Sequence, residues 1–479
     1  MRKTKIVATL GPATDNPDVL RGMIAAGLDV ARFNFSHGTH EEHRKRIEQM
    51  RIACKENGAI IALLADTKGP EIRLDVFKEG KVELVAGNLF TLTSESVEGD
   101  DTIASISYAD LSREISPGAT ILIDDGLVEL RVESISGKNI NTRVVIGGPV
   151  SNRKGVNVPN VNLDFPYISA KDRSDLRFFV ENGFDFIAAS FVRSAEDIQE
   201  IREELHRLDS NNNIRIIAKI ENASGVKNID SILSVSDGLM VARGDMGVEL
   251  AFEEVPILQK VLIKKAVSQG KPVITATQML ESMVVNSRPT RAEAADVANA
   301  VYDGTSALML SGETAAGRYP IESIITMARI AERIERDIDY RHRVKDADYR
   351  TETSVTNAIS HATVTTAHDL RIAAILTVSM SGDTARNVAK FRPECPIIAC
   401  TPDPVVQRQL KLVWGVVPLL TEKEADTTTM FNHAVETAQK TGLIKTGDVV
   451  VLTAGVPVGS SGTTNMLKVH VVGEQILVS

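Results

Sequence analysis

Cysteine is scarce in this chain of 479 residues, which contains only Cys54, Cys395 and Cys400. The three form no C-x-x-C pair and no even-numbered set, so we expect no disulfides and a reducing compartment, the cytoplasm. Long apolar runs are also absent. No stretch is long enough to cross a bilayer, and the first apolar run stops at Gly11 and Pro12, too early for a signal sequence. We therefore expect neither secretion nor membrane insertion.

Positive charge is in deficit as well. The chain has 54 Lys and Arg residues against 63 Asp and Glu residues, a formal net charge of −9. This balance disfavours nonspecific binding to nucleic acid or to anionic membranes, but it leaves room for a local basic pocket that binds a small anion. The hydrophobic content of 43% and charged content of 24% are typical of a folded globular protein. The length favours about three domains.

Eight short apolar runs, each followed by a helical pattern, occupy most of the first two thirds of the chain. They are KIVATL, DVARFNFS, IIALLAD, FDFIAAS, IRIIAKIE, GLMVARGD, PVITATQ and SALMLSG. Strands that alternate with helices predict parallel βαβ units, and eight units predict a (β/α)8 TIM barrel with its active site at the strand carboxyl ends. We assign residues 1–69 and 169–345 to this barrel. Thr39 and Glu42 form a capping box that predicts a helix start, and Gly58 is placed to end that helix.

Two further regions depart from the barrel pattern. Residues 70–168 contain short alternating segments divided by turn residues, which predict an inserted small β-barrel. Because it follows the third barrel run, we expect it to act as a lid over the barrel mouth that excludes water. Residues 346–479 begin a second pattern of helices and strands, which predicts a separate C-terminal α/β domain.

The most informative residues are Lys219, Glu221 and Asp245, which close the fifth and sixth barrel runs. Lys219 and Glu221 are two positions apart, so on a strand they share a face. Carboxylates suit a divalent metal ion, and a neighbouring ammonium can offset the charge of a phosphoryl group in transfer. The alternative is a buried structural ion pair.

Other barrel runs also end in polar residues, so we expect a convergent set at one mouth. The set is Arg32, Asn34, Ser36, Asp66, Thr67, Lys219, Glu221, Asp245, Thr275, Thr277, Ser311 and Glu313. A single member could be an ordinary strand-end polar group satisfied by backbone or water.

Several longer segments carry a family resemblance. They are ARFNFSHG, LADTKGPEIR, IIAKIEN, VARGDMGVE, VITATQMLESM and NSRPTRAEAADVANAVYDGTSALMLSGETAAGRYP. In this order they resemble the signature segments of pyruvate kinases, of the bacterial type without an extra C-terminal phosphohistidine-like domain. The resemblance covers essentially the whole chain. It implies a phosphotransferase of glycolysis that converts phosphoenolpyruvate and ADP into pyruvate and ATP, forms a homotetramer and is regulated through its C-terminal domain.

The resemblance also assigns roles to residues. Glu221 and Asp245 would bind Mg²⁺ or Mn²⁺, and Lys219 would stabilise the moving phosphoryl group. Arg32 would hold the substrate phosphate with its planar fork, unless it forms only a barrel-end salt bridge. The backbone at Gly244 and Asp245, just before an expected helical turn, would bind the substrate carboxylate, although the glycine could be a plain turn residue.

A potassium site is implied by Asn34, Ser36, Asp66 and the Thr67 carbonyl, since one carboxylate among neutral oxygens fits a monovalent ion. Members of the family that work without K⁺ carry lysine where this chain has Glu71, so Glu71 implies K⁺ dependence.

The nucleotide contacts implied by the resemblance are Pro12, Asn34, His37, Arg73 and Lys171. His37 could instead serve only the start of a helix. Thr277 matches the residue associated with protonation of enolpyruvate. A threonine hydroxyl is a poor acid alone, so we expect it to orient a water relay with Ser311 and Glu313.

The C-terminal segments TVSMSGDTARNVAKFRP and GVPVGSSGTTN match the effector site of the family. Their candidate phosphate ligands are Ser379, Ser381, Thr384, Ser461, Gly462 and Thr463. Asp383 stands where members that bind a sugar bisphosphate have a basic residue, so a sugar monophosphate or AMP is the expected effector. A helix cap at Asp383 without any effector is the alternative.

Two other functions compete with this one. A carbon–carbon lyase can also use a Mg²⁺ barrel, but it needs neither an ADP pocket nor a lid. A non-catalytic sensor of phosphometabolites would show losses among the charged residues, and none is missing.

Overall fold

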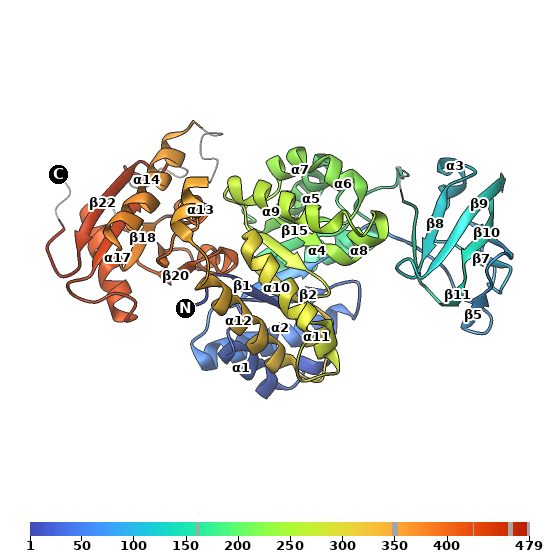
Figure 1. The fold of residues 1–479 in the computed structure, drawn as a ribbon, viewed down its shortest axis with the longest axis horizontal. Helices are drawn as coiled ribbons and strands as arrows, with labels where there is room; N and C mark the ends of the chain where they lie inside the picture. The colour runs from blue at the N-terminus through green and yellow to red at the C-terminus, as the bar shows by residue number, and fades with distance from the viewer. Residues whose placement is uncertain (160, 162, 347–352, 425, 458–462, 477–479) are drawn as a thin grey trace.

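The computed structural model describes residues 1–159, 161, 163–346, 353–424, 426–457 and 463–476. Three bodies lie in a row (Figure 1): a barrel in the middle, a small β domain on one side and an α/β domain on the other. The predicted (β/α)8 barrel, inserted β domain and C-terminal α/β domain are confirmed. Within the described ranges, every helix is too short or too polar to cross a bilayer.

The central body is a closed barrel of eight parallel strands in the order β1-β17-β16-β15-β14-β13-β3-β2. The strands are β1 Lys5–Thr9, β2 Val30–Asn34, β3 Ala62–Asp66, β13 Phe186–Ala189, β14 Arg215–Ile220, β15 Gly238–Ala242, β16 Val273–Ala276 and β17 Ala307–Leu310. Each lies within one of the eight predicted runs. All eight strands are almost entirely buried, as expected where side chains fill the inside and helices cover the outside.

Helices surround this barrel. They are η1 Pro12–Thr14, α1 Pro17–Ala25, α2 His40–Asn57, α4 Ala170–Glu181, α5 Ala195–Leu208, α6 Ala223–Lys227, α7 Ile229–Val235, α8 Arg243–Glu249, α9 Val255–Ser268, η2 Glu281–Val284, α10 Arg291–Asp303, α11 Gly312–Ala315 and α12 Pro320–Glu335. The predicted signals of α2 are confirmed. Thr39 is its N-cap in a capping box with Glu42, and Gly58 ends it in the left-handed conformation at φ 59°.

Over its described residues, the inserted body is all-β apart from one short helix, α3 Leu111–Glu114. Its strands are β4 Ile72–Arg73, β5 Lys81–Leu84, β6 Leu89–Thr93, β7 Ile103–Ser105, β8 Thr120–Ile123, β9 Val128–Ser136, β10 Asn139–Ile146, β11 Gly148–Ser151 and β12 Gly155–Asn157. They form a seven-stranded sheet and a pair, β11 with β5.

This insertion lies between β3 and α4, so it leaves and rejoins the barrel at the strand carboxyl ends. It stands to one side of the barrel in Figure 1. Asn157 of the insertion donates a 2.8 Å hydrogen bond to Glu249 of α8. The insertion thus touches the barrel beside the predicted site.

The C-terminal body is a five-stranded sheet in the order β20-β19-β18-β21-β22, parallel except for β22. Its elements are α13 Tyr340–Asp346, α14 Val355–Leu370, β18 Ala374–Val378, α15 Asp383–Ala389, β19 Ile397–Thr401, α16 Pro404–Gln409, η4 Leu410–Leu412, β20 Val416–Leu420, α17 Thr427–Lys440, β21 Val449–Ala454 and β22 Met466–Val471.

The segment α16–η4 joins this body to the amino-end mouth of the barrel. Leu412 is fully buried and belongs to the same core cluster as the side chains inside the barrel, such as Val7 and Met240. Arg408 pairs with Asp185 at 2.8 Å directly before β13. The C-terminal domain therefore closes the end of the barrel opposite the predicted site.

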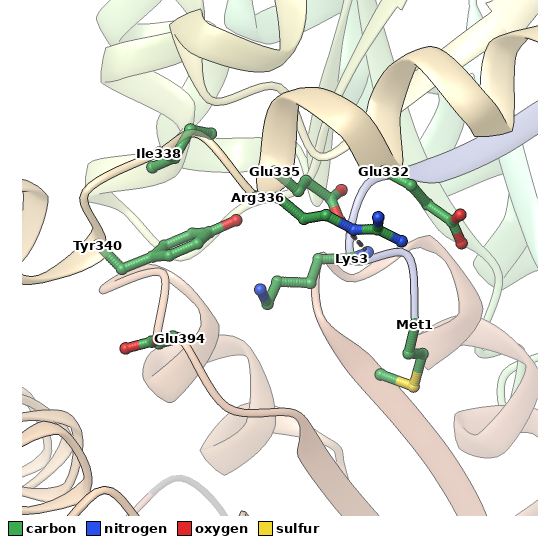
Figure 2. A pocket seen from close by; sticks show the side chains of 8 residues that line it. All are labelled: Met1, Lys3, Glu332, Glu335, Arg336, Ile338, Tyr340 and Glu394. Atoms are coloured by element: carbon green, nitrogen blue, oxygen red, sulfur yellow. Dashed lines mark hydrogen bonds between the residues drawn. The ribbon is translucent and has the colours of Figure 1, made fainter.

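A cavity of about 390 Å³ lies at this same closed end (Figure 2). It is lined by Met1, Lys3, Glu332, Glu335, Arg336, Ile338, Tyr340 and Glu394. The Lys3 ammonium lies 4.2 Å from the centroid of the Tyr340 ring, and its backbone N–H donates to Glu335 at 2.8 Å. The lining residues precede β1, belong to the last turn of α12 or follow that helix, so the cavity is remote from the strand carboxyl ends.

Candidate active site

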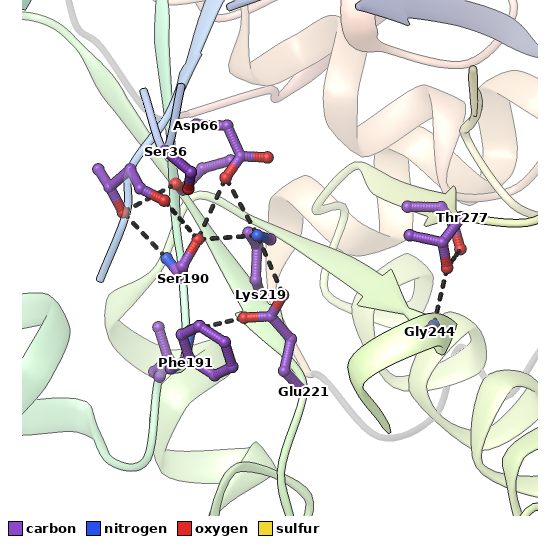
Figure 3. Close-up of polar contacts among 12 residues, drawn as sticks. Ser36, Asp66, Ser190, Phe191, Lys219, Glu221, Gly244 and Thr277 are labelled. Atoms are coloured by element: carbon purple, nitrogen blue, oxygen red, sulfur yellow. Dashed lines mark hydrogen bonds and ion pairs between the residues drawn. The ribbon is translucent and has the colours of Figure 1, made fainter. Parts of the chain in front are cut away.

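Lys219 lies at the centre of a buried polar cluster at the carboxyl end of β14. Its ammonium is 3.0 Å from Asp66 and 3.0 Å from Glu221, and it donates to the Ser190 hydroxyl at 2.7 Å (Figure 3). These partners come from the ends of three neighbouring strands, β3, β13 and β14. The predicted convergence of these strand ends is therefore present.

The cluster keeps Lys219 charged. Burial alone would lower the pKa of Lys219, but the carboxylates of Asp66 and Glu221 outweigh burial and raise it. Burial likewise acts to raise the pKa of Asp66, whereas Arg32 and Lys219 outweigh it and lower that pKa. Both groups therefore stay ionised at neutral pH, and a positive charge is fixed at this rim.

Glu221 has a different electrostatic environment. Burial, followed by the negative charge of Asp245, raises the pKa of Glu221 to about 7, although Lys219 acts in the opposite direction. Its second oxygen accepts the Phe191 N–H at 2.6 Å. Two carboxylates that repel each other at an oxygen-rich rim are a donor set that a divalent cation would stabilise. The residues present therefore fit a divalent ion.

Arg32 is held by neighbours on both sides. Its Nε donates to Asp66 at 2.7 Å, and one terminal nitrogen donates to the Thr9 hydroxyl at 2.8 Å. The structure thus contains the barrel-end salt bridge that the sequence left as an alternative.

The four residues expected around K⁺ lie on neighbouring strand ends. Asn34 is in register with Asp66, and the Asn34 side chain accepts the Ser36 N–H at 3.1 Å. The Thr67 carbonyl accepts the Ser190 hydroxyl at 2.7 Å. All the oxygens proposed for K⁺ therefore belong to one edge of the barrel.

The RGDMG segment differs in detail from expectation. Arg243, Gly244 and Asp245 form the first turn of α8 and do not precede it, because the chain turns into the helix directly after β15. The Gly244 N–H already donates to the Thr277 hydroxyl at 2.8 Å, and that hydroxyl donates to the Ala276 carbonyl at 2.6 Å. Thr277 is thereby tied to the start of α8 (Figure 3).

Glu313 and Ser311 lie at the end of β17. Glu313 is buried, and its two oxygens accept the backbone N–H groups of Ser311 at 2.7 Å and Leu280 at 3.0 Å. The carboxylate therefore fastens two loops together, while the Thr277 hydroxyl is engaged separately with Gly244 and Ala276.

The nucleotide candidates lie around the same mouth. Pro12 and His37 are exposed, at the start of η1 and in the loop after β2. Lys171 of α4 donates to the Phe35 carbonyl at 2.9 Å, which places its ammonium beside the loop of His37.

Glu71 and Arg73 lie at the base of the inserted domain. The Arg73 fork donates to both Glu71 oxygens at 2.6 and 2.8 Å, and Lys68 pairs with Glu71 at 2.9 Å. Burial acts to raise the pKa of Glu71, but the hydrogen bonds from Arg73 and Lys68 outweigh it and lower the pKa. Glu71 is thus a charged carboxylate at the base of the inserted domain.

The expected effector turn is formed after β18. The Ser379 hydroxyl accepts the Gly382 N–H at 3.0 Å, and Ser381 donates to Asp383 at 2.5 Å. Asp383 also pairs with Arg386 at 2.6 Å. The alternative of an N-cap at Asp383 is wrong, because Gly382, in the left-handed conformation, is the cap and Asp383 is the first helical residue.

The facing loop is only partly described. The Thr464 hydroxyl donates to the Thr384 hydroxyl at 3.0 Å, so the two segments meet. Thr463 is exposed beside this contact. Ser461 and Gly462 lie outside the described residues.

Ser190 and Phe191 were not singled out from the sequence. Ser190 closes the run FDFIAAS and so carried the same strand-end signal as its neighbours. Phe191 acts through its backbone N–H in a left-handed conformation, at φ 55°, for which the sequence offers no signal.

Comparison with known proteins identifies the family that this chain resembles. Residues 1–324 match the family model of the pyruvate kinase barrel domain, and residues 357–470 match that of the pyruvate kinase alpha/beta domain. A pyruvate kinase of Sporosarcina psychrophila is 50% identical over 476 residues, covering 99% of this chain and 81% of that protein. One from Geobacillus stearothermophilus is 51% identical over 475 residues, with the same coverage. The crystal structure of a pyruvate kinase from Cryptosporidium parvum matches with a TM-score of 0.93 at 39% identity, covering 98% of this chain and 96% of that one.

Proposed function

The chain belongs to the pyruvate kinase family, and we propose that its phosphoryl transfer takes place at the Lys219 cluster. The reaction is transfer of the phosphoryl group of phosphoenolpyruvate to ADP, which gives pyruvate and ATP. The observation that supports this location of the reaction is the buried ammonium of Lys219, which lies 3.0 Å from both Asp66 and Glu221.

Lys219 and Arg32 supply the positive charge. Negative charge gathers on the phosphoryl oxygens and on the enolate oxygen during transfer, so fixed cations lower the barrier. Lys219 is held charged by its carboxylate partners. Arg32 carries the planar fork that suits phosphate oxygens, and Asp66 fixes its orientation.

Membership in the family implies a divalent cation, and Glu71 in place of lysine implies K⁺ as well. Glu221 and Asp245 would hold the Mg²⁺ or Mn²⁺ ion, as the mutual repulsion of the two carboxylates favours. When bound, that ion neutralises charge on the phosphate and the enolate. K⁺ would be held by Asn34, Ser36, Asp66 and the Thr67 carbonyl. The presence of Glu71 supports K⁺ dependence.

The substrate would be oriented by its carboxylate at the first turn of α8, near Gly244 and Asp245. Thr277 would orient the water that protonates enolpyruvate at C3, because its hydroxyl is fixed between Gly244 and Ala276. ADP would lie at the same mouth. Its contacts would come from Pro12, Asn34, His37, Arg73 and Lys171.

The remaining parts of the proposal concern the whole enzyme. Residues 70–168 would close as a lid over a barrel of residues 1–69 and 169–345, and residues 346–479 would form the regulatory domain. The paired Asp383 and Arg386 leave the effector turn with little net positive charge, which favours a sugar monophosphate or AMP. We further propose a cytoplasmic homotetramer that binds no nucleic acid and no membrane.

A coupled assay tests this function. ATP production from phosphoenolpyruvate and ADP should require Mg²⁺ and K⁺, and candidate sugar monophosphates or AMP should change its rate. Absence of ATP formation under these conditions would contradict the function. A full rate without K⁺ would contradict the assignment of Glu71 alone.

A further inference from the structure

The turn that carries Thr277 has an unusual backbone. Thr277 and the following Gln278 have φ angles of 69° and 55°, in the left-handed region. A β-branched residue is strongly disfavoured there, so the surrounding contacts must hold the turn in place. The sequence around it, TATQML, contains no glycine that would relieve this cost.

Arg243 supplies those contacts. Its Nε donates to the Ala276 carbonyl at 3.3 Å, and a terminal nitrogen donates to the Thr277 carbonyl at 2.6 Å. The same guanidinium reaches the Met279 sulfur at 2.8 Å and Asp296 of α10 at 2.7 Å. Its side chain is only 11% exposed, so these bonds act in a region largely shielded from water.

The position of Arg243 in the chain is equally informative. It is the first residue of α8, and the next residue, Gly244, donates its N–H to the Thr277 hydroxyl. Arg243 therefore binds the backbone of the Thr277 turn, while Gly244 binds the Thr277 hydroxyl. A planar fork with several donors can span two consecutive carbonyls and a carboxylate, which a lysine ammonium cannot do.

We propose that Arg243 is the positioning residue that sets the Thr277 hydroxyl for protonation of enolpyruvate, an inference that rests on the proposed role of Thr277. In that step C3 of the enolate takes a proton from solvent, the electron pair of the C2–C3 double bond forms the new C–H bond, and the C2–O bond becomes the carbonyl. Arg243 touches none of these atoms. It acts through the turn, so its loss affects protonation more than phosphoryl transfer.

The experiment separates the two steps in the full-length enzyme. NMR measures the exchange of the pyruvate methyl protons with D₂O in the presence of Mg²⁺, K⁺ and inorganic phosphate. This exchange reports the protonation step in reverse. Single-turnover ATP formation reports phosphoryl transfer. Arg243→Lys is compared with Thr277→Ala, with the double variant, and with Arg202→Lys as a matched control. Arg202 also donates to a carbonyl and a carboxylate, those of Val235 and Asp237, but at the opposite end of the barrel.

Arg243→Lys should slow proton exchange about tenfold or more, and ATP formation by less than about threefold. In the Thr277→Ala background the same change should slow exchange by less than about twofold, because both substitutions act on one element. Arg202→Lys should leave both rates unchanged. Equal slowing of exchange in the two backgrounds, or equal loss of both steps, overturns the role of Arg243 and leaves the function intact.

Two further readings complete the test. If Thr277→Ala exchanges protons at the wild-type rate, the proposed role of Thr277 is wrong and this inference falls with it. If Arg243→Lys does not fold, Asp296→Asn loosens the anchor of the guanidinium without touching the turn. That variant should slow exchange about threefold with ATP formation retained, and unchanged exchange overturns the inference.

Discussion

Replacing Lys219 with methionine removes the buried cation while keeping the length and apolar part of the side chain. At the 3.0 Å that separates the ammonium from each carboxylate, two unit charges interact with about 5 kcal/mol at an effective dielectric of about 20. A phosphoryl oxygen at a similar distance from the ammonium is stabilised by up to this amount as its negative charge develops. Since about 1.4 kcal/mol corresponds to tenfold in rate, Lys219→Met should lower kcat for ATP formation by about 10³- to 10⁴-fold.

Divalent metal binding should survive this substitution, because Glu221 and Asp245 both remain. Titration with Mn²⁺ at pH 8, followed by electron paramagnetic resonance, measures it. Lys5→Met is the matched control, since Lys5 is also buried on a barrel strand but donates to the Val416 carbonyl at the other end. The control should lower Tm and leave kcat within about threefold of wild type. ATP formation by Lys219→Met within tenfold of the wild-type rate would refute the reasoning.

Three other predictions concern other parts of the chain. Leu412→Ala should lower the free energy of unfolding by about 2–5 kcal/mol, measured by urea denaturation, because it opens a cavity in the fully buried end of the barrel core; an unchanged midpoint would show that η4 does not contribute to that core. Glu71→Lys should keep its activity in K⁺-free buffer while the wild type loses it, since the new ammonium can replace the ion, and equal losses in both would contradict this. Asp29 is buried, which acts to raise the pKa of its carboxyl, but Lys411 and Arg2 outweigh burial and lower that pKa far below its ordinary value of 3.8. The ionised Asp29 therefore stabilises the fold fully above pH 3.8, and this stabilisation is lost as the pH falls below 3.8. Asp29→Asn should therefore be less stable at pH 7, by about 3–5 kcal/mol, and lose less stability than wild type between pH 5 and 3; parallel losses in denaturation experiments would contradict the assignment.

The barrel could be predicted because each of its strands is buried on both faces. Such strands are continuous apolar runs, and the run IRIIAKIE also places Lys219 on β14 and Glu221 directly after it, with their side chains together. The polar strand ends could be predicted as a site because the barrel fold brings the carboxyl ends of all its strands to one mouth. Ser190 could have been found by the same rule.

Other features could not be predicted from the sequence because they depend on tertiary contacts. Leu412 looks like an ordinary apolar residue in the sequence, and only the docking of α16–η4 makes it part of the barrel core. Arg243, the first residue of α8, contacts the Thr277 turn, which lies more than thirty positions later in the chain. The N-cap of α15 is Gly382, and the carboxylate of Asp383, the alternative cap, pairs with Arg386.

The most direct test of the central claim is a crystal structure with Mn²⁺ and phosphoenolpyruvate, in which anomalous scattering locates the metal. We predict one Mn²⁺ ion bound by Glu221 and Asp245, with a phosphate oxygen within about 3 Å of the Lys219 ammonium. A metal or a phosphate bound elsewhere on the molecule, with Lys219 facing neither, would contradict the account.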